Sequence, residues 1–138
     1  MGSPSTHPVR EIMHREVATV RRNDALDVAD EKMAQGRFRH LVVLDEEGAI
    51  VGVISRRDLF RGALATAMGY GERAQLNVLR TLVAKEVMTS PVRTVGPETT
   101  VAEAGRLLLD LQIGCLPVVD GERLVGIVTV TDLLRLLV

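Results

Sequence analysis

One short pattern occurs twice, as GVISRRD at residues 52–58 and as GIVTVTD at residues 126–132. Each copy has a glycine, two β-branched residues, a hydroxyl residue, two variable positions and an aspartate. Apolar, strand-like residues come before each copy and a helix-like, leucine-containing run follows it. The hydroxyl and the carboxylate are therefore expected where a strand ends and a helix begins, which is a common place to hold a phosphorylated ligand.

The repetition extends far beyond this pattern. Met13 and Met88 are separated by 75 positions (88 − 13), and Thr19-Val20 matches Thr94-Val95 at the same offset. The two motif glycines are one position closer together, so the turn before the second copy is one residue shorter. We interpret the chain as a tandem duplication, in which neither half buries a full core of its own.

Composition excludes several functional classes. The 138 residues are 46% hydrophobic and 2% aromatic with a net charge of −1, which favours an aliphatic core and argues against nucleic-acid binding. No apolar run approaches a membrane span and no signal segment is present, so we expect no membrane association. The single Cys115 favours a reducing, cytoplasmic location. We interpret Cys115 as a buried strand residue rather than a nucleophile.

Periodicity and turn residues predict the elements of both halves. The expected helices or helical turns are residues 9–15, 25–35, 58 onward, 100–111 and 132–138, and the expected strands are 17–20, 41–44, 49–54, 115–119 and 123–128. Between the halves, residues 63–82 are expected to be helical with a break at Gly69-Tyr70-Gly71. That break nominally fits a dinucleotide fingerprint, but no strand precedes it.

The order strand-helix-strand-strand-helix, ending in the repeated motif, resembles the CBS domain family, here as a tandem pair (a Bateman module). The resemblance covers residues 8–62 and 83–138, and it leaves residues 1–7 as a disordered or vector-derived end. It implies an α+β fold of two βαββα repeats packed sheet-to-sheet about a pseudo-two-fold axis. It also implies clefts that bind AMP, ADP, ATP or S-adenosylmethionine-like ligands, and association into a homodimer. No cofactor is required, and the regulated protein is unknown.

The same resemblance assigns roles to residues of both halves. Asp58 and Asp132 match the ribose-binding position, and Ser55 and Thr129 match the phosphate-binding hydroxyl. Adenine contacts are implied for Thr19, Val20, Leu41, Val42, Thr94, Val95, Cys115, Leu116 and Pro117. The alternative is that Ser55-x-x-Asp58 and Thr129-x-x-Asp132 merely cap their helices.

The two halves differ in charge. Arg39 and His40 precede the central strand of the first half, and Arg56 lies inside its motif, whereas the second half has mostly uncharged counterparts. We therefore expect the first cleft to prefer the more highly phosphorylated ligand. The alternative for Arg56 is a solvated residue at a helix start.

No catalytic signature accompanies these motifs. The chain has no G-x-S-x-G elbow, activated Ser/His/Asp set or Walker loop, so we expect no enzymatic activity. His7 and His14 show no spacing that suggests a metal site. The remaining function classes are a ligand-sensing module, a structural dimerisation module with empty clefts, and a regulatory fragment of a larger enzyme or transporter.

Overall fold

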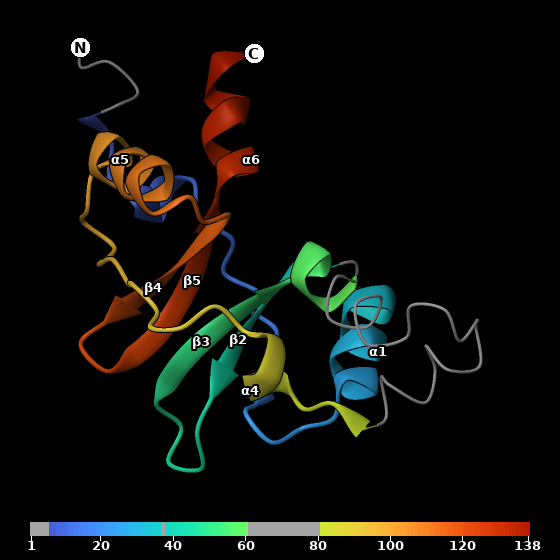
Figure 1. Ribbon diagram of the computed structural model, residues 1–138. Helices are drawn as coiled ribbons and strands as arrows, with labels where there is room; N and C mark the ends of the chain where they lie inside the picture. Colours follow the sequence, from blue (N-terminus) through green and yellow to red (C-terminus); the bar gives the residue numbers. More distant parts are fainter. Residues whose placement is uncertain (1–5, 37, 61–80) are drawn as a thin grey trace. The chain divides into compact units, whose positions relative to one another are not determined.

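A computed structural model describes residues 6–36, 38–60 and 81–138 (Figure 1). Helices alternate with strands, and the strands form one three-stranded and one two-stranded sheet, which confirms the α+β class. The chain divides into two compact units, Ala18–Val92 and a second unit that joins Met1–Val17 to Arg93–Val138. These units follow packing rather than repetition, so the boundaries of the repeats at 8–62 and 83–138 stay a prediction.

The unit Ala18–Val92 is built on a sheet in the order β1-β2-β3. Its elements are β1 (Thr19–Arg21), α1 (Leu26–Gly36), β2 (His40–Leu44), β3 (Ile50–Ser55), a helical stretch at residues 56–60, and α4 (Ala84–Val87). β1 runs parallel to β2, and β3 runs antiparallel to it. The tight β2–β3 connection is a turn at residues 45–48, where Gly48 adopts a φ of 87° that favours glycine.

An aliphatic core explains these elements. Leu26, Ala29 and Met33 recur at helical spacing and are buried along α1, as predicted for residues 25–35. They belong to one cluster with Leu41 and Ile54 of the sheet. The apolar run of β2 is fully buried from Leu41 to Val43, as expected for a strand covered on both faces.

The second unit places helices beside a two-stranded hairpin. Its elements are η2 (Val9–Glu11), α5 (Val101–Leu111), β4 (Cys115–Asp120), β5 (Arg123–Thr129), α6 (Val130–Leu134) and η3 (Arg135–Leu137). The Thr100 hydroxyl accepts a hydrogen bond from the Glu103 N–H and caps α5. In Figure 1, α5 lies against the β4–β5 hairpin, and Ala104 and Leu108 pack there with Leu116 and Val128.

Two expected elements are different in the structure. Thr94-Val95 corresponds to Thr19-Val20 of the strand expected at residues 17–20, but it forms a single parallel bridge between Val95 and Val118 and no named strand. The last helix begins at Val130 rather than Asp132, because Thr129 is its N-cap, and it tightens to a 3₁₀ turn from Arg135. The helical insert and its glycine turn fall mostly at residues 61–80, outside the described residues.

Each methionine landmark packs against the motif strand of the other repeat. A Cβ added to Gly126 would lie 2.6 Å from Met13 Sδ, and one added to Gly52 would lie 2.5 Å from Met88 Sδ. Glycine is therefore required at both positions by close approach. The opening segment of the first repeat, which contains Met13, belongs to the unit of the second motif, and the opening segment of the second repeat, which contains Met88, belongs to the unit of the first motif.

Candidate functional site

The first motif ends β3 and begins the helical stretch at residues 56–60. The Asp58 N–H donates to Ser55 Oγ over 3.0 Å, and the Ser55 N–H donates to Asp58 Oδ2 over 3.0 Å. This reciprocal capping box satisfies two backbone donors that a helix start otherwise leaves unpaired. Within the described part of the chain, Asp58 Oδ1 has no hydrogen-bond partner. The helix begins at Arg56, two residues before the predicted start.

The β2–β3 register brings the predicted phosphate residues of this motif together. His40 lies opposite Ser55, and the Arg56 N–H donates to the Arg39 carbonyl oxygen over 2.8 Å. Arg39 and Arg56 are both exposed to solvent. Residues that are distant in sequence therefore meet at the end of the hairpin where the helix begins.

The second motif repeats this arrangement with neutral neighbours. The Thr129 N–H donates to Asp132 Oδ2 over 2.8 Å, and the Asp132 N–H donates to Thr129 Oγ1 over 3.2 Å. Cys115 lies opposite Thr129, and the Val130 N–H donates to the Gly114 carbonyl oxygen over 3.1 Å. Glycine and valine thus occupy the places that arginines hold in the first motif.

Asp132 has a further partner that sequence reasoning missed. His14 Nε2 lies 2.7 Å from Asp132 Oδ1, and the Asp132 side chain is only 3% exposed, whereas that of His14 is 52% exposed. The sequence gives His14 no role, because its spacing from His7 does not suggest a metal site. The offset of 75 positions pairs His14 with Thr89, whose side chain is much shorter. This difference between the halves is the sequence feature that points to His14.

The residues predicted to contact adenine lie on the strands beside each motif. Thr19 is next to Val42 in the parallel β1–β2 pair, and Val95 bonds to the carbonyl oxygen of Pro117 through its N–H. Most of these side chains are buried, whereas Thr94 is exposed and Thr19 is partly exposed. The buried ones are Val20, Leu41, Val42, Val95, Cys115, Leu116 and Pro117. Packing in the core explains why these side chains are apolar, and their contact with a ligand remains a prediction.

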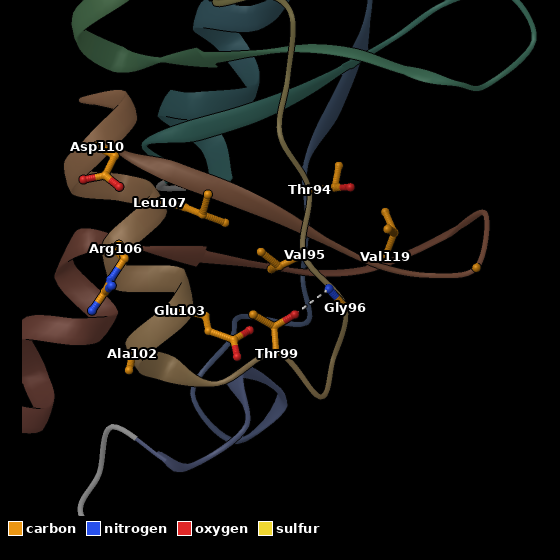
Figure 2. Close-up of a pocket in the computed structure, with 11 residues that line it drawn as sticks. Thr94, Val95, Gly96, Thr99, Ala102, Glu103, Arg106, Leu107, Asp110 and Val119 are labelled. Atoms are coloured by element: carbon orange, nitrogen blue, oxygen red, sulfur yellow. Dashed lines mark hydrogen bonds between the residues drawn. The ribbon is translucent and has the colours of Figure 1, made fainter.

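A cavity of about 860 Å³ lies elsewhere in the second unit (Figure 2). It is bounded by the segment Thr94–Gly96, by α5 and by Val119 and Gly121 at the β4–β5 turn. The Gly96 N–H donates to Thr99 Oγ1 over 3.0 Å at its edge. Only Thr94 and Val95 are shared with the predicted site, and neither Thr129 nor Asp132 lines it. This cavity and the motif chemistry therefore do not coincide, and we base the site on the motifs because their geometry is repeated.

Among the described residues, no group of three histidine, cysteine or acidic side chains is placed to hold a metal ion. In the same part of the chain, every helix is too short or too polar to cross a bilayer.

Comparison with known proteins identifies the repeats. The family model described as CBS domain matches residues 9–65 and 84–138. The CBS domain of a CBS domain-containing membrane protein from Sphaerobacter thermophilus is 34% identical with a TM-score of 0.79, covering 97% of this chain and 90% of that one. CBSX2 in complex with AMP is 29% identical (TM-score 0.70, 94% of both chains). The CBS domain pair of MJ0100 in complex with 5′-methylthioadenosine and S-adenosylmethionine is 28% identical (TM-score 0.75, 94% of both chains).

Several curated relatives are much longer than this chain. The chain is 32% identical over 130 residues to an uncharacterized protein of Methanocaldococcus jannaschii, matching 92% of itself but 31% of that protein. It is 28% identical to the homoserine O-acetyltransferase of Methanococcoides burtonii, matching 94% of itself but 24% of the enzyme.

Proposed function

The chain belongs to the CBS domain family, and we propose that it is a non-catalytic regulatory module that binds adenosine-containing nucleotides. The observation that carries this proposal is the matched pair of hydroxyl–carboxylate motifs, Ser55/Asp58 and Thr129/Asp132, at two helix starts. Relatives that cover 94% of this chain were solved with AMP, or with 5′-methylthioadenosine and S-adenosylmethionine. This similarity supports the same ligand class here.

The capping bonds leave room for a ligand at the first motif. Asp58 uses Oδ2 to accept from Ser55, so Oδ1 can accept from the hydroxyls of a ribose. Ser55 Oγ accepts one bond from the Asp58 N–H, and its own O–H can still donate to a phosphate oxygen. Capping and binding are therefore compatible roles, and a phosphate would add to the bonds at the helix start.

The basic residues favour phosphates at this motif. Arg39, His40 and Arg56 stand beside Ser55 through the hairpin register. An arginine near a helix N-terminus is mildly unfavourable unless an anion lies close by. We therefore assign the phosphates to these three side chains, and the adenine to the neighbouring strand residues around Thr19 and Leu41.

Transmission of the bound state requires a partner surface. α5, α6 and η3 enclose an apolar groove of about 810 Å³ lined by Leu109, Leu134 and Leu137, which are 79%, 55% and 79% exposed. Exposed leucines grouped on one face mark an interaction site. We assign this face to a homodimer whose packing responds to nucleotide. A cytoplasmic location fits the buried Cys115, which is the single cysteine of the sequence.

A second candidate function follows from the length of the relatives. Because the chain matches only 31% and 24% of two of them, the same module can regulate a larger protein or serve there as a structural dimerisation unit. A dimerisation unit with empty clefts needs no ribose carboxylate. Nucleotide binding therefore discriminates between the two functions.

The deciding experiment is calorimetric titration and thermal shift with AMP, ADP, ATP, 5′-methylthioadenosine and S-adenosylmethionine. A ligand at a hundred times its Kd should stabilise the fold by about 2.7 kcal/mol. Asp58→Asn keeps a cap but loses a charged acceptor, and it should weaken binding by about 1.5–3 kcal/mol. Asp30→Ala, an exposed aspartate on α1 of the same unit, is the matched control. Absence of binding by all five ligands would overturn the sensing function.

A further inference from the structure

The backbone of His14 is fixed against β5. His14 and Ile127 exchange two backbone hydrogen bonds, each 2.9 Å long. Met13 packs on Gly126 just beside them, and a Cβ on that glycine would lie 2.9 Å from the His14 carbonyl oxygen. The position of His14 relative to the second motif is therefore determined by a strand partner and by close packing.

From this anchored backbone, the imidazole of His14 reaches Oδ1 of Asp132. The 2.7 Å separation between Nε2 and Oδ1 requires a proton on Nε2, so His14 donates to the carboxylate. Asp132 Oδ2 is already used by the Thr129 N–H. With both oxygens engaged and the side chain 3% exposed, a ribose cannot reach this carboxylate unless His14 moves.

Among the residues that the structure describes, none covers Asp58 of the first motif in this way. Thr89 occupies the place equivalent to His14, since it exchanges backbone bonds of 2.8 and 3.2 Å with Val53. Among the described residues, the Thr89 side chain makes no bond to Asp58, whose Oδ1 has no partner there. Asp58 is also partly exposed. The two ribose positions thus differ in accessibility as well as in nearby charge.

We propose that His14 is a specificity-determining residue that closes the second motif and makes it the weaker of two nucleotide sites. This inference rests on the proposed function, because it concerns the same ribose carboxylates. Nucleotide fills the Asp58 site first, and the Asp132 site fills only when His14 gives up its bond. Two sites with separated affinities extend the concentration range over which the module responds.

Calorimetric titration with AMP in an Asp58→Asn background isolates the second motif. His14→Thr copies the residue of the other repeat, and it should tighten AMP binding there about tenfold, which corresponds to about 1.4 kcal/mol. His14→Gln keeps an N–H donor and should tighten binding less. Because His14 is half-exposed, both variants should keep the fold, which circular dichroism checks directly.

The reciprocal variant Thr89→His, made in the Asp132→Asn background, should install the cover on the first motif and weaken AMP binding about tenfold. Weaker binding in His14→Thr would mean that His14 holds the ligand, and this result overturns the inference. Unchanged affinity in His14→Thr also overturns it, while Asp58-dependent AMP binding would leave the proposed function intact. No AMP binding by wild type or any variant would overturn both.

Discussion

Met88 Sδ lies 2.5 Å from the point where a Cβ on Gly52 would stand, and Met13 Sδ lies 2.6 Å from the equivalent point on Gly126. In both places a backbone carbonyl oxygen is also close, at 3.0 Å for Thr89 and 2.9 Å for His14. The two contacts hold the opening segment of each repeat against the motif strand of the other repeat. They determine which residue, His14 or Thr89, stands near each motif aspartate.

Gly52→Ala and Gly126→Ala should each destabilise the fold by about 1–3 kcal/mol, because the added methyl overpacks these contacts. The methionine side chain can move, but the carbonyl oxygen belongs to a paired backbone segment and cannot. Urea unfolding measures the change. The control is Gly96→Ala, where the nearest atom to the new Cβ is 3.9 Å away and the change should stay below about 0.5 kcal/mol. Equal stability of all three variants would contradict the packing argument.

Ser55→Ala and Thr129→Ala should each cost about 1 kcal/mol of stability without any ligand, because each hydroxyl caps a helix. Thermal or urea unfolding of the nucleotide-free protein tests this. Thr131→Ala is the control, because Thr131 is exposed in the first turn of α6, whose N-cap is Thr129. If the losses appear only when nucleotide is present, the hydroxyls serve the ligand and not the helix.

Local signals predicted most of the elements. The spacing of Leu26, Ala29 and Met33 located α1, and the apolar run around Val42 located a strand covered on both faces. Gly48 and Gly121, with φ values of 87° and 65°, lie in the two short gaps between the paired strands that the sequence predicts at 41–44 and 49–54 and at 115–119 and 123–128. These features depend on neighbours within a few residues, so the sequence contains them directly.

The pairing between His14 and Asp132 could not be predicted in the same way. Alignment of the halves shows which residues correspond, but not which copy each segment packs against. Met13 of the first repeat packs on Gly126 of the second, and Met88 of the second repeat packs on Gly52 of the first. This exchange depends on tertiary packing. The helix begins at Arg56, two residues before the predicted start, because Asp58 is the partner of the Ser55 cap and not the first helical residue.

Asp45 should contribute stability that disappears in acid. Hydrogen bonds from the backbone N–H groups of Ala49 and Glu47 lower the pKa of its carboxyl below 3.8. A lowered folded-state pKa means that the contribution is complete above the unfolded value of 3.8 and is lost as pH falls through the folded value. Asp45→Asn should therefore be less stable than wild type at pH 7, and the difference should shrink at about pH 2. Urea midpoints across this range measure it, and a constant difference would contradict the assignment.

Leu137→Asp and Leu109→Asp should convert the proposed homodimer to a monomer, because each places a charge in the apolar groove between α5 and η3. Both leucines are 79% exposed, so the monomer fold should lose little stability. Light scattering after size-exclusion chromatography measures the mass. Leu111→Asp, on the same helix but outside the groove, is the control. A wild-type monomer, or variants that stay dimeric, would reject this face as the interface.

Arg56→Ala should weaken ATP binding more than AMP binding, because Arg56 stands beside the first-motif hydroxyl and can pair with the outer phosphates. The side chain is exposed, so we expect a modest loss of about three- to tenfold for ATP, equal to about 0.7–1.4 kcal/mol. Raising the salt concentration should reduce the difference between wild type and variant, since it screens exposed charges. Val130→Ala changes the equivalent position of the second motif and should affect ATP and AMP equally. Calorimetry with both nucleotides gives the two ratios, and a uniform loss in Arg56→Ala would assign this arginine to the helix start alone.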